Sequence, residues 1–298
     1  LNLLRGGTWR QRFKMVVFWL ILLVVVVLYP VLTWSIYHFQ PSIMYRPFKE
    51  VLYNPGDIGL AYENVTLKTK NGLKITGWYI PCESAGKTVL FCHGNGGNIA
   101  HRLDTINILN EQGLNCLIFD YRGYGNSQGK PSEKGTYLDA EAAWDWLMSI
   151  KNVQPEDVII FGRSMGGSIA SYLASRTEPA GLVIESSFTS YRDIGKHYYP
   201  YMPVFQLAAF DYDTLRYVKQ IECPVLVIHS KTDEIVPYKF GVRLFEAAPE
   251  PKLFVEIYGK HNDGFLLSVD TYRKAWVDWL EIVRQDQYRN NKLFRKIS

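Results

Sequence analysis

The sequence predicts an α/β protein with a mostly parallel central sheet flanked by helices and preceded by one transmembrane helix. Short, continuous apolar runs alternate with segments of helical periodicity, which is typical of parallel strands covered on both faces. Two segments of alternating polar and apolar residues precede these runs, and a long uncharged apolar stretch lies near the N-terminus. A chain of 298 residues is long enough to bury one sizeable core.

The 33 Lys+Arg and 29 Asp+Glu residues give a formal net charge of +4, and the excess lies at the two ends. Residues 1–14 contain four basic residues and no acid, and residues 284–298 contain five basic residues and one acid. The body between them is slightly acidic, which argues against a nucleic-acid-binding domain with a basic stripe. A hydrophobic content of 47% with 21% charged residues also excludes an intrinsically disordered chain.

The apolar stretch predicts a retained membrane anchor over residues 15–37. No Asp, Glu, Lys or Arg occurs from Met15 to Tyr45, and Met15–Leu32 is almost purely apolar. A helix needs about 20 such residues to cross a hydrocarbon core about 30 Å thick. A buried core helix would carry a polar face, and a cleaved signal peptide would end in small residues. Neither feature is present, so we expect a signal-anchor.

The flanking charges predict the orientation of this anchor. The basic head, residues 1–14, is expected in the cytoplasm and the body outside it, because only Arg46 and Lys49 follow the span closely. Residues 38–60 contain three prolines and are expected to form a juxtamembrane connector. A folded domain over residues 61–285 follows. Residues 286–298 are expected to form a solvated basic tail, with a contact to anionic headgroups as the alternative.

The strands of the domain follow from its apolar runs. Asn71-Gly72 joins the two alternating segments and is a strong hairpin signal. Apolar spacing predicts helices over Tyr137–Ile150 and Tyr272–Val283. The six runs expected to form the parallel strands are Thr88–Cys92, Cys116–Phe119, Val158–Phe161, Leu182–Ile184, Val225–Ile228 and Leu253–Ile257.

The four cysteines do not indicate a metal site. Cys92 and Cys116 lie inside strand-like runs, and Cys82 and Cys223 lie next to prolines. None has metal-ligand spacing and no cofactor motif is present, so we expect neither a metal nor a cofactor. Buried thiols are the simplest interpretation, and an extracytoplasmic disulfide stays open.

The segment Gly162–Gly166 reads G-R-S-M-G and lies between an apolar run and a helix-like run. This is the strand–turn–helix setting of a G-x-S-x-G nucleophile. Side chains at either glycine are expected to collide with neighbouring backbone. The N-terminus of the following helix favours negative charge that develops beside Ser164. Ser164 is therefore the candidate nucleophile.

A second glycine-rich turn, His93–Gly97, directly follows the first parallel run. Acyl transfer needs two N–H donors for the oxyanion. The expected pair is the backbone N–H of Met165, next after the nucleophile, and that of Asn95 in this turn. His93 is expected to orient the turn rather than to transfer protons. No phosphate-binding glycine motif is present.

Two further strand ends carry a candidate acid and base. Asp233 lies a few residues past Val225–Ile228, with Glu234 as a rival carboxylate. His261 lies in the loop after the last apolar run. An imidazole there can accept the Ser164 proton, and a carboxylate can hold its tautomer and stabilise the imidazolium.

Together these features resemble the α/β-hydrolase superfamily over about residues 61–283. The family shares the chain order Ser164, Asp233, His261. The matching landmarks are HGNGG (93–97), FDYRGYGNSQG (119–129), GRSMGG (162–167), HSKTDEIVP (229–237) and GKHND (259–263). With its N-terminal anchor, the chain is similar to membrane-anchored abhydrolase-domain serine hydrolases. The resemblance implies a Ser-Asp-His triad that hydrolyses esters or thioesters, but it implies no particular substrate.

We therefore expect a membrane-anchored serine hydrolase that cleaves carboxylic ester or thioester bonds of small-molecule or lipid-like substrates through an acyl-enzyme. The alternatives are a serine peptidase of the same fold and a non-catalytic membrane-tethered scaffold. The segment Glu185–Cys223 is short and rich in Tyr and Phe. Its rings are expected either to pack in the core or to form an apolar wall for an acyl group close to the bilayer.

Overall fold

The computed structural model describes residues 8–83 and 86–297, with side chains up to residue 289. Its centre is an eight-stranded sheet in the order β10-β9-β8-β7-β4-β6-β3-β2. The strands from β10 to β6 are parallel, whereas β3 is antiparallel to both β6 and β2. The strands are β2 (Glu63–Lys68), β3 (Lys74–Ile80), β4 (Lys87–Cys92), β6 (Leu114–Phe119), β7 (Val158–Arg163), β8 (Gly181–Glu185), β9 (Val225–Ser230) and β10 (Lys252–Ile257).

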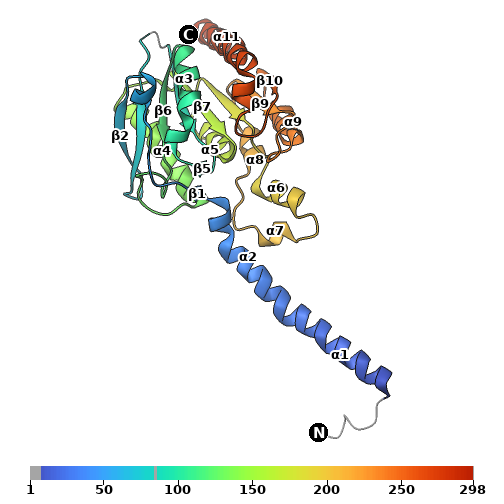
Figure 1. Cartoon of the computed structure of the whole chain (residues 1–298). Coiled ribbons are helices and arrows are strands. Elements are labelled where there is room, and N and C mark those ends of the chain that lie inside the picture. The colour runs from blue at the N-terminus through green and yellow to red at the C-terminus, as the bar shows by residue number, and fades with distance from the viewer. Residues whose placement is uncertain (1–7, 84–85, 298) are drawn as a thin grey trace.

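The predicted α/β class is confirmed, since each of the six apolar runs lies within one parallel strand and the hairpin turns at Asn71-Gly72. Helices cover both faces of the sheet (Figure 1). The rings of Phe91 and Phe161 stack on one face with centroids 4.4 Å apart. Leu90 and Ile160 point into the core on the other face. Burial on both faces explains why these strands are continuously apolar.

One face of the sheet carries α3 (Leu103–Glu111) and α11 (Val269–Ile297). The other face carries α4 (Glu133–Ser149), α5 (Met165–Ala174), α8 (Thr214–Val218) and α9 (Tyr238–Ala247). The remaining short elements are β1 (Arg46–Pro47), β5 (Gly96–Gly97), α6 (Tyr191–Tyr198), α7 (Val204–Leu207), α10 (Gly264–Leu267) and the 3₁₀ turns Pro55–Ile58, Ile99–Arg102 and Pro155–Asp157.

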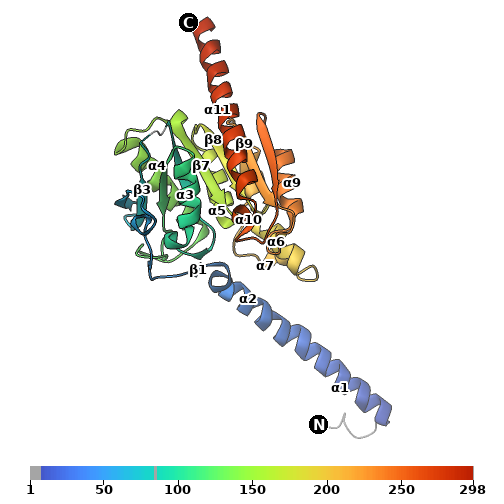
Figure 2. The same cartoon turned by 45° about the horizontal axis from the view of Figure 1, so that its top comes forward.

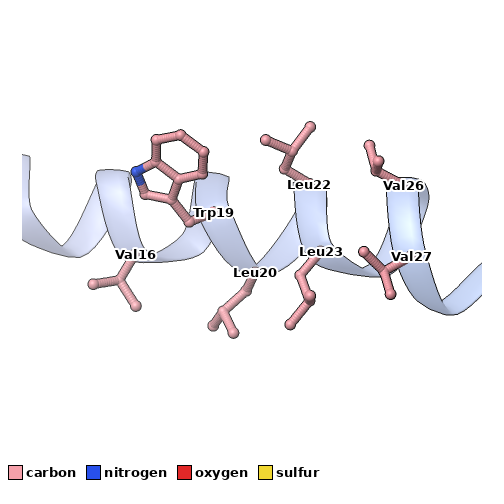
Figure 3. Close-up of a pocket in the computed structure, with 7 residues that line it drawn as sticks. All are labelled: Val16, Trp19, Leu20, Leu22, Leu23, Val26 and Val27. Atoms are coloured by element: carbon pink, nitrogen blue, oxygen red, sulfur yellow. The ribbon is translucent and has the colours of Figure 1, made fainter.

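The N-terminal segment is one long helix that projects away from the domain (Figures 1 and 2). It comprises α1 (Trp9–Leu23), a wider turn over Val24–Leu28 and α2 (Tyr29–Met44). In the described part of the chain it is the one helix long and apolar enough to cross a membrane, and none of its most apolar window is buried. Figure 3 shows apolar side chains on opposite sides of this helix, as expected of a lipid-facing span.

The anchor helix extends past the predicted boundary at residue 37 and into the expected connector. Pro41 lies inside α2, yet the helix continues to Met44. A proline removes one backbone N–H donor, and the loss is small here because the helix ends within a turn, where Tyr45 N–H still bonds to Pro41 O at 2.9 Å. Residues 1–7 of the predicted basic head, including Arg5, lie outside the described residues.

The last helix is also longer than the sequence pattern predicts. The expected helix over Tyr272–Val283 lies inside α11, which continues through the residues assigned to a basic tail as far as Ile297. Its buried side is anchored by Trp276 and Trp279, which are fully buried against the sheet. The C-terminal end projects from the domain on the side away from the anchor (Figure 2).

Candidate active site

The predicted site residues lie at the carboxyl ends of four parallel strands. Ser164 directly follows β7, and the turn that contains Asn95 follows β4. Asp233 and His261 lie in the loops after β9 and β10. Parallel strands end at the same edge of the sheet, so four segments distant in sequence meet there. The same edge faces the anchor, because β5 in the β4 turn pairs with β1, which follows α2 (Figure 1).

Ser164 occupies a strained turn between β7 and α5. Its backbone angles are φ 55° and ψ −122°, a conformation that L-residues rarely adopt. A Cβ on Gly162 would lie 2.2 Å from Gly166 O, and one on Gly166 would lie 2.0 Å from Cys92 O. The two glycines therefore let α5 approach β4 and β7 closely enough to hold the turn, as the motif predicts.

Neighbouring strands fix both backbone groups of Ser164. Its N–H donates to Glu185 O at the end of β8, at 2.9 Å. Its carbonyl accepts from the Ser187 hydroxyl at 2.8 Å and from Gly167 N–H at 2.9 Å. These three hydrogen bonds offset the strain and direct the Ser164 side chain toward the loop after β10.

A hydrogen-bond chain joins the three side chains that the sequence singled out. The distance between Ser164 Oγ and His261 Nε2 is 3.0 Å, and that between His261 Nδ1 and Asp233 Oδ2 is 2.8 Å. Ser164 and Asp233 are 9% exposed and His261 is 7% exposed, so the chain is nearly shielded from water while its serine stays reachable. The geometry is that of a nucleophile, a base and an orienting acid.

The environment of Asp233 keeps it ionised. Burial raises the pKa of this carboxyl, but the His261 hydrogen bond and the N–H groups of Ile235 and Val236 outweigh burial and bring the pKa below its usual value. The two N–H groups donate to Asp233 Oδ1 at 2.9 and 2.7 Å. An ionised carboxylate can stabilise the imidazolium that forms when His261 accepts a proton.

Glu234, the rival carboxylate, also contacts His261, but through the backbone. Its Oε2 accepts a hydrogen bond from His261 N–H at 2.9 Å. Asp233 thus orients the ring and Glu234 holds the loop that carries it. The sequence places both acids beside the strand end, and only the three-dimensional structure separates their contacts.

The two predicted oxyanion donors lie in the two segments next to Ser164. Met165 is the first residue of α5, and Gly94 of the β4 turn would place a Cβ only 3.5 Å from Ser164 Cβ. The N–H groups of Met165 and Asn95 have no hydrogen-bond acceptor within the described residues. Two hydrogen bonds fix the position of Asn95. Its carbonyl accepts from Tyr124 Oη at 2.8 Å, and its side-chain amide donates to Met44 O at 2.7 Å.

His93 lies outside the hydrogen-bond chain. It is fully buried, its Nδ1 lies 2.7 Å from Gly94 O, and burial lowers the pKa of its ring to about 3. The ring is therefore neutral at pH 7. Asp120 lies beside it, with Oδ1 3.7 Å from His93 Nε2, and burial raises the pKa of this carboxyl to about 7. His93 supports the turn by packing and by its bond to Gly94, as the sequence predicts.

A buried ion pair that was not predicted from the sequence lies behind Ser164. Arg163 Nη2 donates to Glu185 Oε2 at 3.0 Å, and Nε of the same guanidinium lies 2.8 Å from Glu185 Oε1 as part of the ion pair. Tyr272 Oη donates to Glu185 Oε2 at 2.8 Å. The Arg163 guanidinium also lies 4.0 Å from the ring centroid of Phe265, in α10. The pair joins β7 and β8 to α10 and α11. The charged Arg163 inside the apolar G-x-S-x-G segment indicates a buried ion pair, but the sequence does not show that its partner is Glu185, because that residue lies on another strand.

No group of three or more His, Cys, Asp or Glu side chains that could hold a metal ion occurs among the described residues. None of the four cysteines forms a disulfide within the same residues.

Comparison with known proteins agrees with this fold. A family model described as the alpha/beta hydrolase fold matches residues 87–193. An uncharacterized protein of Mycobacterium tuberculosis is 38% identical over 231 residues, which cover 76% of this chain and 82% of that protein. The structure of the Pyrococcus furiosus esterase Pf2001 covers 80% of this chain and 97% of its own with a TM-score of 0.66 and 24% identity, which shows the shared fold.

Two further relatives carry more informative names, one as a membrane protein and one as a lipase. An uncharacterized membrane protein of Saccharomyces cerevisiae is 33% identical over 244 residues, covering 78% of this chain and 86% of that protein. The lysophosphatidylserine lipase ABHD12 of Danio rerio is 29% identical over 294 residues, covering 83% and 75%. The chain belongs to the α/β-hydrolase superfamily. Within it, the chain resembles the membrane-anchored abhydrolase-domain hydrolases.

The raised pKa of Asp120 predicts a pH-dependent loss of stability. The unfolded carboxyl ionises near pH 3.8 and the folded one near pH 7, so folding stability falls as the pH rises between these values and then levels. Asp120→Asn should remove this loss, which is up to about 4 kcal/mol for a shift of about three pH units. Urea unfolding at pH 5 and pH 8 covers about two of these three pH units, so the measured difference should be about 2.7 kcal/mol. The control Asp104→Asn, at an exposed position, should show the same change of unfolding free energy with pH as the wild type. The same change in Asp120→Asn would contradict the assignment of this pH dependence to Asp120.

Proposed function

We propose that this protein is a membrane-anchored serine hydrolase that cleaves carboxylic ester or thioester bonds through an acyl-enzyme. The observation that carries the proposal is the continuous hydrogen-bond chain from Ser164 through His261 to Asp233, set on a strained turn. A strained backbone at a reactive side chain is found where the surrounding structure is built to hold it. Membership of the α/β-hydrolase superfamily and the esterase and lipase neighbours support the same chemistry.

The proposed reaction has two halves. Ser164 Oγ attacks the substrate carbonyl while His261 Nε2 takes its proton, and the N–H groups of Asn95 and Met165 bind the oxyanion. His261 then gives the proton to the departing alcohol or thiol, which leaves Ser164 acylated. A water molecule then enters, gives a proton to His261 and attacks the acyl carbon. The bond from this carbon to Ser164 Oγ breaks, His261 returns the proton to Ser164 Oγ, and the carboxylic acid leaves. Asp233 stays ionised throughout and stabilises the imidazolium in both halves.

The proposed substrates are lipid-like esters. The relative from Danio rerio is a lysophosphatidylserine lipase, and the anchor helix would hold this domain beside a bilayer. The aromatic segment between β8 and β9 divides into two groups in the structure. Phe210 and Tyr212 are buried and pack in the core, whereas the rings at and after the end of α6 are exposed. The exposed group is available to contact apolar material outside the domain.

A fluorophosphonate probe tests the assignment of the nucleophile. The full chain in detergent should be labelled, and Ser164→Ala should abolish both the labelling and the hydrolysis of p-nitrophenyl esters. Ser168→Ala is a matched control, since Ser168 is buried in α5 and its hydroxyl has no hydrogen-bond partner within the described residues. It should keep its label. Folded wild type that resists the probe would favour the scaffold alternative, and cleavage of peptides but not esters would favour a peptidase.

The two neighbouring acids should differ sharply in their effect on turnover. Asp233→Asn leaves a similar shape but removes the charge that supports the imidazolium, so kcat should fall by roughly 10³ to 10⁴. Glu234→Gln keeps an oxygen that can accept from His261 N–H, and we expect a loss of less than about tenfold. Steady-state kinetics on one p-nitrophenyl ester measures both. Equal losses would mean that the ring and backbone contacts of His261 are misassigned.

We also propose that the N-terminus is cytoplasmic and that the hydrolase domain is extracytoplasmic. The support is the excess of basic residues ahead of the span. Alkaline phosphatase fused after Ser298 should be active, because it folds only outside the cytoplasm, and a cytoplasmic reporter at the same place should be silent. The reverse pattern would overturn the orientation without affecting the proposed chemistry.

A further inference from the structure

Four exposed aromatic side chains form an edge on the domain. We call this set the aromatic edge; it consists of Tyr198 (48% exposed), Tyr199 (60%), Tyr201 (100%) and Phe205 (51%). They lie at the end of α6, in the connection to α7 and in α7 itself. Single exposed apolar residues are common, but four large rings within eight residues, each about half exposed or more, form a continuous exposed aromatic segment.

The aromatic edge is fixed to the membrane anchor by a side chain of α2. Gln40 is 6% exposed, its Nε2 donates to Leu207 O at 2.6 Å, and its Oε1 accepts from Ala209 N–H at 2.7 Å. Both ends of the amide are thus bonded to the backbone at the end of α7. Nearby, Tyr45 Oη lies 2.8 Å from Tyr212 Oη. The end of α7 is therefore hydrogen-bonded directly to the anchor helix.

This attachment sets the height of the aromatic edge above the bilayer core. Gln40 lies three residues beyond the end of the predicted span at residue 37, and an α-helix rises about 1.5 Å per residue, so the contact lies about 5 Å outside the hydrocarbon. The headgroup layer is about 5 to 8 Å thick on each side. Figures 1 and 2 both show α6 and α7 beside α2, at the end of the domain from which the anchor projects. Tyrosine is enriched at this depth in membrane proteins.

We propose that the aromatic edge lies in the headgroup layer of the bilayer that holds the anchor. The bilayer is the occupant because the edge is continuous with the anchor, lies at interfacial height and consists of the residue type that this layer favours. The domain would then rest on the membrane in one orientation, held by the anchor on one side and by the aromatic edge on the other.

The same edge reaches the candidate active site. Tyr198 Oη donates to Ile235 O at 2.7 Å and to Glu234 O at 3.1 Å, in the loop that also carries Asp233. If the proposed hydrolase function holds, an ester in the outer part of the bilayer reaches Ser164 beside this edge without crossing water. This second step rests on the proposed function, whereas the membrane contact of the edge does not.

Fluorescence in vesicles tests the contact. The full chain, with Cys82 and Cys223 replaced by Ser, carries Tyr201→Cys labelled with NBD in phosphatidylcholine vesicles. The matched control is Tyr288→Cys, a 68% exposed tyrosine of α11 on the far side of the domain. The label at 201 should emit at shorter wavelength and be quenched by lipids that carry a nitroxide on the headgroup or at acyl carbon 5, and the label at 288 should do neither.

Two results would overturn the proposal. A label at 201 that matches the one at 288 would place the edge in water, and a label shielded from water but not quenched by lipid would place it against a protein or a second copy. Phe205→Cys serves as the reporter if Tyr201→Cys does not fold. Because no turnover is needed, the test also runs in Ser164→Ala and stays independent of the hydrolase proposal.

Steady-state kinetics on two substrates tests whether the ester reaches Ser164 from the bilayer beside the aromatic edge. Tyr201→Asp places a charge in the headgroup layer, so turnover of a long-chain ester carried in vesicles should fall by about tenfold. Hydrolysis of p-nitrophenyl acetate, which is soluble in water, should stay as in the wild type. Equal losses on both substrates would mean that the substitution damages the site itself, and no loss on either would exclude delivery beside this edge.

Discussion

The backbone of Ser164 can stay at φ 55° because nothing larger than hydrogen separates α5 from the strands beside it. Gly162 and Gly166 make that approach possible, and the hydrogen bonds from the turn to Glu185 and Ser187 hold it. Every other contact of the site depends on this placement. A shift of α5 by the width of a methyl group would carry Ser164 Oγ out of hydrogen-bonding reach of His261. In the proposed reaction it would also move the Met165 N–H away from the substrate carbonyl.

The anchor helix contributes to the same arrangement from the opposite side. Its last residue, Met44, accepts the side-chain hydrogen bond of Asn95, whose backbone N–H is the second proposed oxyanion donor. Its penultimate turn holds α7 through Gln40. The N-terminal helix and the candidate site are therefore in direct contact, and the glycine-rich turn after β4 is positioned from both the sheet and α2.

Local signals in the sequence were enough for much of this architecture. Six apolar runs predicted six parallel strands, and the G-R-S-M-G motif between a strand and a helix predicted the strained turn, because both depend on residues close together in the chain. The choice between Asp233 and Glu234 could not be made in this way. Both carboxylates follow the same strand, and their difference lies in which group of His261, 28 or 27 residues away, each one contacts.

Helix ends and buried ion pairs were harder to predict for the same reason. Pro41 suggested irregular structure, but the helix continues because Gln40 and Met44 gain partners in the domain. Arg163 is buried only because Glu185 and Tyr272, on other elements, satisfy its charge. Removing one member of such a pair leaves the other charge uncompensated in the core. Since Phe265 of α10 lies over Arg163 and α10 follows the His261 loop, the pair also connects the Ser164 turn to the His261 loop behind the candidate site.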